Sequence, residues 1–397
     1  MQVRTVAFYI SGHGFGHASR QIEIINALTR RAPQMSVAIR TSAARWLFDR
    51  TLSRPLEPHH RDHGEHREQN SVTSVTSVVH PSAPTLIEGA TDTGVIQIDS
   101  LRLDEAETIR RAAAFYADLT ERAQTEAGIL RQHDVRLVIA DAPPLACAAA
   151  AAAGVPSIVV ANFTWDWIYA AYREALAFAP GVIETIQAAY SQAEAAWRLP
   201  MHGGFATFRR ITDVPFVARH ARHGREETCR RLGLPAGERL ALSSFGGYGV
   251  SGLDLASLDC FDTWRIVVTG QSPLRDVPRG VCVVDEARLY DSGLRYADLV
   301  AAVDVVVTKP GYGIISECVA NGTAILYTSR GRFAEYDVLV AEMPRFVRCR
   351  YLEQDRLLAG RWRDALDAVV SAPPPPEQPP TNGADVIASM IAERLMS

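Results

Sequence analysis

The sequence predicts an α/β protein with two Rossmann-like, doubly wound domains. Three observations lead to this prediction. A chain of 397 residues is long for one ordinary domain and suits two. Apolar runs of strand length alternate with longer helical stretches in two successive series, and a glycine-rich turn follows the first strand of each series. We therefore expect an N-terminal domain over residues 1–215, a C-terminal domain over 216–372, a proline-rich tether over 373–383 and a C-terminal helix over 384–397.

The first series begins with the near-continuous apolar run 3–10, which is typical of a strand covered on both faces of a parallel sheet. A glycine turn over 11–17 follows, and then a helix whose apolar face carries Ile22, Ile25 and Leu28. Further expected elements are strands over 36–40, 135–140 and 156–161, a long helix over 104–132 and an alanine-rich helix after Asp141.

The second series follows residues 199–224, a segment without clear periodicity. We expect its strands over 239–245, 264–269, 280–284, 304–308 and 323–328. Residues 373–380 hold six prolines and should form an extended, non-helical connection. The apolar residues beyond it have helical spacing, so we expect a final amphipathic helix to dock on the body of the protein. These residues are Val386, Ile387, Met390, Ile391 and Leu395.

The charge balance argues against a polyanion as partner. Asp and Glu outnumber Lys and Arg by 45 to 41, so no general electrostatic attraction to nucleic acid or to an anionic membrane is expected. All of the basic residues except Lys309 are arginine. The six cysteines include no CxxC pair, which argues against a structural zinc site or a disulfide framework. The sequence shows neither a leader peptide nor an apolar run fit to span a bilayer, so we expect a cytoplasmic protein.

The turn GHGFGH after the first strand contains Gly12, Gly14 and Gly16. These glycines allow a ligand to approach the start of the next helix, where free N–H groups favour anions. A dinucleotide-binding fold would place an acidic residue at the end of the second strand, but that strand ends at Arg40 and Thr41. NAD is therefore disfavoured, while Arg40 leaves a small allowance for NADP.

The same turn carries His13 and His17. They lack the HExxH pattern of a zinc pair, so the alternatives are a general base for a substrate hydroxyl or a loop histidine bonded to the backbone. We favour the functional interpretation because α/β proteins place ligands after this strand. Asp141 follows another buried strand, where it could orient a histidine or cap the next helix. The histidine-rich stretch 59–66 is interpreted as a solvated loop, and no metal is expected.

Two glycine-rich turns mark the second domain. The turn Gly246–Gly249 could cradle a phosphate, although it lacks the P-loop spacing. Lys309 precedes Gly311 and Gly313, which open a helix carrying Ser316 and Glu317. This cluster suits a nucleotide, with amides and a cation for phosphates and a carboxylate for ribose hydroxyls. The alternative is an ordinary strand-to-helix turn with a solvated lysine and a glutamate favoured by the helix dipole.

Several stretches resemble known proteins. They are YISGHGFGHASR, DTGVIQIDSLRLDEA, DAPPLACAAAAAAGVPSIVVANFTWDWIYAAY, SSFGGYG and TKPGYGIISECVANGTAILY. Together they resemble the GT-B glycosyltransferase superfamily, including MurG-like enzymes, and more specifically the glycosyltransferase-like N-terminal region of L-arabinokinases and related bacterial proteins. The resemblance implies two domains facing a cleft, with the acceptor in the N-terminal domain and a nucleotide sugar in the C-terminal domain. No counterpart of the arabinokinase kinase domain is expected here.

The resemblance also implies roles for individual residues. His17 is the leading catalytic base, His13 the substitute candidate and Asp141 the residue that orients the base. The expected acceptor-binding residues are Gly14, Phe15, Asn162 and Trp165. The expected donor-binding residues are Gly246, Gly247, Tyr248, Gly249, Lys309, Gly311, Tyr312, Gly313, Ser316 and Glu317.

The sequence thus leads to one favoured function and two alternatives. We expect a metal-independent, inverting glycosyltransferase that moves a sugar from a nucleotide sugar, with UDP as the nucleotide, to a small-molecule or lipid-linked hydroxyl acceptor. The nucleotide sugar is a co-substrate, and no cofactor is expected. The alternatives are a nucleotide-sugar hydrolase, in which water replaces the acceptor, and a non-catalytic module that binds a nucleotide sugar.

Overall fold

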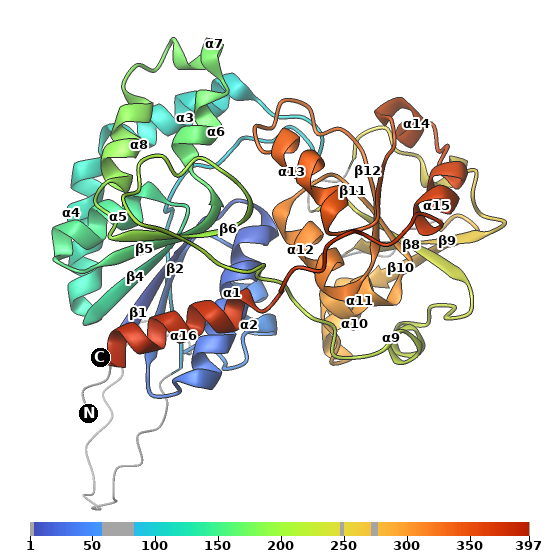
Figure 1. Cartoon of the computed structure of the whole chain (residues 1–397), viewed down its shortest axis with the longest axis horizontal. Coiled ribbons are helices and arrows are strands. Elements are labelled where there is room, and N and C mark those ends of the chain that lie inside the picture. Colours follow the sequence, from blue (N-terminus) through green and yellow to red (C-terminus); the bar gives the residue numbers. More distant parts are fainter. Residues whose placement is uncertain (1–3, 58–82, 247–249, 271–276, 397) are drawn as a thin grey trace, which may run out of the picture.

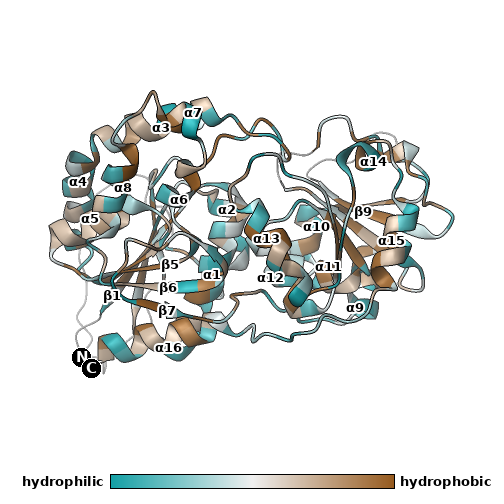
Figure 2. Cartoon of the chain, turned by 45° about the horizontal axis from the view of Figure 1, so that its top comes forward, coloured by the Kyte–Doolittle hydropathy of each residue, from teal (hydrophilic) through white to brown (hydrophobic). Residues whose placement is uncertain are grey.

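A computed structural model describes residues 4–57, 83–246, 250–270 and 277–396. Two lobes lie side by side, and each is a sheet with helices packed around it (Figure 1). Apolar residues run along the strands of both sheets, as the brown colouring of Figure 2 shows. Among the described residues, no helix combines the length and the apolar character needed to cross a bilayer.

The N-terminal lobe is a seven-stranded parallel sheet in the order β3-β2-β1-β4-β5-β6-β7. Its strands are β1 (Thr5–Ile10), β2 (Ser36–Thr41), β3 (Thr85–Glu88), β4 (Val135–Asp141), β5 (Ser157–Phe163), β6 (Ala195–Gly203) and β7 (Ile211–Asp213). Its helices are α1 (Gly14–Arg31), α2 (Arg45–Thr51), α3 (Glu105–Ala117), α4 (Leu119–Gln132), α5 (Pro144–Ala153), α6 (Trp165–Ala170), α7 (Arg173–Leu176) and α8 (Val182–Tyr190).

The C-terminal lobe is a six-stranded parallel sheet in the order β10-β9-β8-β11-β12-β13. Its strands are β8 (Arg239–Ser244), β9 (Trp264–Gly270), β10 (Val281–Asp285), β11 (Val305–Thr308), β12 (Ala324–Tyr327) and β13 (Cys349–Tyr351). Its helices are α9 (Arg225–Leu232), α10 (Glu286–Asp291), α11 (Tyr296–Ala302), α12 (Tyr312–Asn321), α13 (Tyr336–Glu342), α14 (Gln354–Leu358) and α15 (Arg363–Val370). The α/β fold class predicted from the alternating pattern is confirmed.

The strand order places a topological switch point in each sheet. The order reverses between β1 and β4 in the first sheet and between β8 and β11 in the second. At these points the connections leave toward opposite faces of the sheet, and a crevice opens beyond the carboxyl ends of the strands. Of the three glycine-rich turns singled out in the sequence, those after β1 and after β11 therefore lie where a doubly wound sheet binds ligands.

The helix expected over 104–132 is wrong as a single element. The chain forms α3 and α4, which are separated by Asp118 at φ −102° and ψ 23°. Asp104 caps α3 by accepting a hydrogen bond from the Glu107 backbone N–H, a local signal that the sequence did carry. The break has no glycine or proline to announce it. The strands β3, β6, β7 and β13 were also not predicted. Three or four residues carry too little periodicity in β3, β7 and β13, while the nine-residue β6 runs into the segment 199–224, which showed no clear periodicity.

The C-terminal helix α16 (Gly383–Met396) packs on the N-terminal lobe, against α1 (Figure 1). Ile387, Ile391 and Leu395 are buried in the same apolar cluster as β1 and α1. The tether that precedes α16 is tied to the C-terminal lobe by the Arg345–Glu377 ion pair at 2.8 Å and pairs with residue Val217 through Asn382. The chain therefore crosses between the lobes a second time before it ends.

Replacing Ile391 by Ala should destabilise the protein, because the fully buried side chain leaves a cavity between α16 and α1. We expect a loss of about 2–5 kcal/mol in the free energy of unfolding, measured by chemical denaturation. The matched control is Glu393→Gln, an exposed position on the same helix, which should change this free energy by less than about 0.5 kcal/mol. Equal stability of the two variants would contradict the docking of α16.

Candidate functional site

A cavity of about 520 Å³ lies between the lobes and is lined by both. From the N-terminal lobe it is lined by the GHGFGH turn and by residues after β2, β3 and β5. From the C-terminal lobe it is lined by the turns after β8 and β11 and by the segment after β12. Among the candidates from the sequence, those that line it are His13, Gly14, Phe15, His17, Asn162, Trp165, Gly246, Lys309, Gly311, Tyr312, Gly313 and Ser316.

His17 forms a hydrogen bond with Asp141, as the sequence suggested. Its Nδ1 lies 2.8 Å from Oδ2 of Asp141. The carboxylate can only accept, so Nδ1 carries the proton and Nε2 keeps its lone pair. Asp141 is completely buried, while His17 is 14% exposed at the cavity wall. This tautomer and ring orientation suit a general base.

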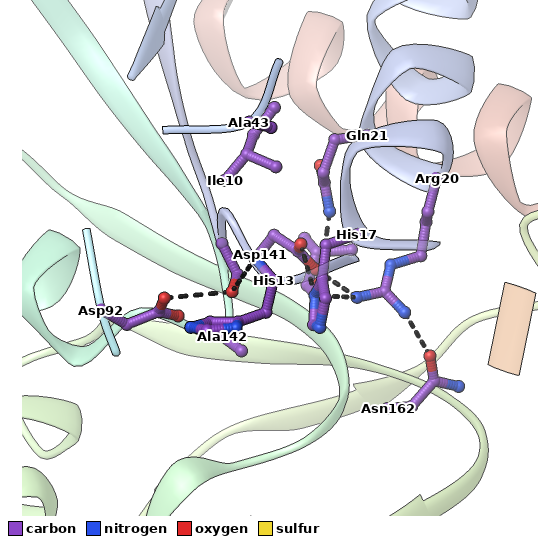
Figure 3. A network of polar contacts seen from close by, with 12 residues as sticks. Ile10, His13, His17, Arg20, Gln21, Ala43, Asp92, Asp141, Ala142 and Asn162 are labelled. Carbon is purple, nitrogen blue, oxygen red and sulfur yellow. Dashed lines mark hydrogen bonds and ion pairs between the residues drawn. The ribbon is translucent and has the colours of Figure 1, made fainter. Parts of the chain in front are cut away.

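Arg20 completes this group and was not anticipated from the sequence. Its guanidinium pairs with Oδ1 of Asp141 and donates to Oδ1 of Asn162 (Figure 3). Burial alone would raise the pKa of Asp141, but the charge of Arg20 and the contacts with His17 outweigh it and lower the pKa below its usual range. Asp141 therefore stays ionised. A sequence signal did exist, since Arg20 stands three residues after His17 and shares its helix face.

Backbone topology explains why these side chains meet. Asp141 is the last residue of β4 and pairs in register with Ile10, the last residue of β1. The α1 helix begins four residues after Ile10, so its first turn stands over the end of β4. His17 and Arg20 lie on that turn and the next one. The juxtaposition follows directly from placing β4 beside β1.

His13 belongs to a second group, centred on Asp92. The buried Asp92 accepts hydrogen bonds from Ser11 Oγ at 3.0 Å and from Trp165 Nε1 at 2.8 Å. Burial lowers the pKa of His13 and raises that of Asp92, and the attraction between the two groups opposes both shifts. Gly94 is required beside the imidazole, because a Cβ there would overlap the His13 ring. Asp92 lies within a stretch that carried the family resemblance, yet nothing in its spacing marked it as a site residue.

The expected acceptor-binding residues differ in their surroundings. Phe15 is 43% exposed, and its ring meets that of Trp46 edge-on at 5.7 Å between centroids. Asn162 uses Oδ1 to accept from Arg20 and Nδ2 to donate to the Pro200 carbonyl at 2.7 Å. Its amide is thus engaged in positioning Arg20. Trp165 is almost fully buried between the cavity and Asp92.

On the opposite wall, α12 begins at the cavity with Gly311 as its N-cap. Its Gly313 faces the first turn of α1 so closely that a Cβ there would lie 3.4 Å from Cα of Gly16. The N-termini of α1 and α12 therefore converge on one space, and both favour negative charge.

Of the turn after β8, Gly246 lines the cavity, whereas Gly247, Tyr248 and Gly249 lie outside the described residues, as does the stretch 59–66.

Glu317 lies on α12 but does not line the cavity. Its Oε1 accepts from Arg219, with Nε at 2.5 Å, and its other carboxylate oxygen has no hydrogen-bond partner among the described residues. Burial raises the pKa of Glu317, while the charge of Arg219 opposes the shift. A ribose contact would require Arg219 to move or to share the carboxylate.

Lys309 points across the cleft rather than into solvent. Its Nζ donates to Oε1 of Gln97, in the N-terminal lobe, at 3.3 Å. Burial lowers its pKa to about 7, and the nearby charge of Arg330 adds to the effect. Among the described residues, no carboxylate forms an ion pair with this ammonium; Glu335 pairs with Arg330 instead, at 2.7 Å.

Residues 97–102 form an interlobe loop that reaches from the N-terminal lobe into the C-terminal lobe. The buried Ser100 hydroxyl donates to the carbonyl of Phe245 at 2.6 Å. Leu101 is part of an apolar cluster of the C-terminal lobe. The loop therefore braces the turn after β8 and also supplies the partner of Lys309.

Two other expectations concern dinucleotides and metals. The Arg40 guanidinium is held by Glu126, with Nη2 at 2.6 Å and Nε at 3.0 Å from the carboxylate oxygens. It is therefore engaged in an internal ion pair and not presented to an NADP phosphate.

Within the part of the chain that the structure describes, no group of three or more His, Cys, Asp or Glu side chains is arranged to hold a metal ion.

Comparisons with known proteins place this geometry in a wider context. The fold matches that of the glycotransferase of kitacinnamycin (16% identity, TM-score 0.58, covering 100% of this chain and 99% of that one) and CalG4, the calicheamicin glycosyltransferase (14%, 0.57, 100% and 98%). It also matches UGT2 from Phytolacca americana (12%, 0.57, 98% and 94%). The chain has the GT-B glycosyltransferase fold.

In sequence, this GT-B chain is 28% identical to an L-arabinokinase from Arabidopsis thaliana over 391 residues. The match covers 98% of the chain but 34% of the L-arabinokinase, so the chain spans about a third of the length of that relative. No protein-family model matches the chain. The predicted resemblance to GT-B proteins and to L-arabinokinase is confirmed at the level of fold and sequence similarity.

The burial of Lys309 predicts a pH-dependent effect on stability. Lys309 has a pKa of about 7 in the folded protein, against 10.5 when free. When the pH lies between these two values, unfolding is therefore accompanied by uptake of a proton by Lys309. The buried charge of Lys309 therefore destabilises the folded state to its full extent below about pH 7, and this destabilisation disappears as the pH approaches 10.5. We therefore expect Lys309→Met to raise the apparent Tm by about 1–3 °C at pH 7, with a smaller gain at pH 9.

The control for this prediction is Arg332→Met, whose side chain is 67% exposed and pairs with Glu105 at the surface. It should leave Tm unchanged at both values of pH. A Tm of Lys309→Met below that of the wild type at pH 7 would show that the ammonium is stabilised by the fold.

Proposed function

We propose that the protein transfers a sugar from a nucleotide sugar, with UDP as the nucleotide, to a hydroxyl acceptor, with inversion at the anomeric carbon and without a metal ion. One observation carries the proposal: the His17–Asp141 pair and the N-terminus of α12 face the same interlobe cavity. A base on one wall and an anion site on the other are what this reaction requires. Among proteins with the same fold, UGT2 from Phytolacca americana was solved with UDP-2fluoro-glucose and pterostilbene.

In the N-terminal lobe, His17 Nε2 accepts the proton of the acceptor hydroxyl as its oxygen attacks the anomeric carbon. Asp141 holds the Nδ1 proton and stabilises the imidazolium that forms, in the manner of the orienting carboxylate in hydrolase triads. Arg20 keeps Asp141 ionised and in place. His13 stands beside His17 as the alternative base; its lowered pKa keeps it neutral and able to accept a hydrogen bond.

In the C-terminal lobe, the bond between the anomeric carbon and the phosphate oxygen breaks, and the electron pair leaves with the nucleoside diphosphate. The N–H groups that open α12 at Gly311, Tyr312 and Gly313 would stabilise this developing charge, together with Gly246, which follows the neighbouring strand β8. Ser316 and Glu317, one turn further along α12, remain the candidates for the nucleoside. Attack from the N-terminal wall and departure toward the opposite wall account for inversion.

Replacing His17 by Ala should lower kcat about 10²–10⁴-fold, because the acceptor hydroxyl loses its base. UDP binding, measured by calorimetry, should change less than about threefold. Asp141→Asn should also reduce kcat, because the amide cannot hold the same imidazole tautomer. The matched control is His133→Ala. His133 lies just before the first residue of β4, whereas Asp141 is the last residue of that strand, so the two stand at opposite ends of it. Wild-type turnover by His17→Ala would assign the base elsewhere.

The alternatives separate in the same measurements. Release of free sugar from a UDP-sugar without any acceptor would identify a hydrolase. Tight binding of a UDP-sugar without turnover across a broad panel of hydroxyl acceptors would identify a binding module. Absence of any nucleotide binding would contradict all three functions.

A further inference from the structure

One part of the cavity holds an unbalanced positive charge that the proposed chemistry does not use. Lys309 and Arg330 both line it, and among the described residues that line it Glu335 is the only one with a carboxylate. Glu335 is committed to Arg330 at 2.7 Å. Asp99, the other carboxylate close enough to influence Lys309, is paired with Arg102 at 2.7 Å. When Lys309 is protonated, the group therefore carries one net positive charge within the described residues.

Arg330 is buried and held in a fixed position by its neighbours. It is 9% exposed, and its guanidinium lies over the ring of Phe333 at 3.6 Å from the centroid. Nη1 is used by Glu335, while Nε is buried and has no hydrogen-bond partner among the described residues. A buried donor without a partner is costly, so a ligand atom is the natural acceptor.

Lys309 adds a second donor to the same place. Its ammonium is mostly buried and contacts an uncharged amide, Gln97, in place of a carboxylate. A buried charge without a counter-ion destabilises the free protein. Both cations thus line the same cavity, where Arg330 keeps one donor, Nε, without a partner among the described residues, and Lys309 has an amide in place of a carboxylate.

The position of this group differs from that of the expected diphosphate site. The sequence suggested Lys309 as a cation for the phosphates, whereas the proposed function assigns the phosphates to the backbone N–H groups at the helix start Gly311–Gly313 and at Gly246. The side chain of Lys309 extends from the C-terminal lobe to Gln97 in the N-terminal lobe, across the space in which the transferred sugar must lie between donor and acceptor. Glu335 and Gln97 offer oxygen atoms for ring hydroxyls beside the two cations.

We propose that Lys309 and Arg330 form a subsite for a carboxylate on the transferred sugar, so that the donor is a nucleotide-linked uronic acid. The inference rests on the proposed function, because it assumes that a nucleotide sugar occupies the cavity. The carboxylate accepts from Lys309 Nζ and Arg330 Nε and neutralises the net charge of the group. Charge-assisted hydrogen bonds of this kind are among the stronger polar contacts in proteins.

The test compares four ligands by calorimetry with the 397-residue chain: UDP, UDP-glucose, UDP-glucuronate and UDP-galacturonate. We expect wild-type protein to bind one of the uronates at least about tenfold more tightly than UDP-glucose. In Lys309→Met this preference should fall to about twofold or less, while the affinity for UDP itself changes by less than about threefold. Arg330→Gln should behave in the same way, and Arg332→Gln, an exposed neighbour, should keep the wild-type preference.

The controls address folding and the competing site. Lys309→Met carries the test, since its melting temperature is expected to be no lower than that of the wild type. If both variants lose affinity for UDP as strongly as for the uronates, the two cations bind the diphosphate and the proposal is wrong. If wild-type protein binds UDP but shows no preference for a uronate, the subsite takes a neutral sugar and the proposal is again wrong. If UDP and all UDP-sugars fail to bind, the proposed function itself is contradicted and this inference with it.

Discussion

The buried carboxylate of Asp141 is the interaction on which the arrangement of the N-terminal wall depends. It is fully buried at the end of β4, and its two oxygens hold His17 and Arg20. Burying a carboxylate is costly unless it is paired and hydrogen-bonded. Asp141 meets that condition through its contacts with His17 and Arg20, which both lie on α1. The contact with His17 also fixes the imidazole in one tautomer. The contacts that stabilise this buried carboxylate are therefore the same contacts that orient the proposed base.

The second constraint is the way in which the two lobes meet. The interlobe loop places Ser100 and Leu101 in the C-terminal lobe, and α16 returns the end of the chain to the N-terminal lobe. Between these links, Gly16 and Gly313 allow the starts of α1 and α12 to approach closely. Two helix N-termini and the side chains of Lys309 and Arg330 then border one cavity. The site is consequently a property of the pair of lobes, because each lobe supplies part of the groups that the proposed transfer reaction needs.

Much of the fold could be predicted from local patterns. The buried strands of both sheets have apolar runs that survive any tertiary context, and the glycine turns after β1 and β11 marked the ligand-binding edge. Prediction was weakest where the signal was short or absent, as at the break near Asp118 and in the three-residue strands β7 and β13. In the candidate site, His17 and Asp141 were recognisable because both stand at the carboxyl end of a buried strand, Asp141 as the last residue of β4 and His17 just after β1. Asp92 and Arg219 were not, because they act from loops whose position is set by distant segments.

The sequence by itself determined the α/β class, the two series of strands, the glycine turns at their carboxyl ends and the unusual isolation of Lys309 among arginines. It could do so because strand periodicity, helix periodicity and turn chemistry are local properties of the chain. Only the tertiary structure decided that Asp141 serves both His17 and Arg20, that Glu317 is paired with Arg219, and that Lys309 faces Gln97 without a counter-ion. The two residues of each of these pairs lie between 98 and 212 positions apart in the sequence. No local pattern encodes which distant group will compensate a buried charge.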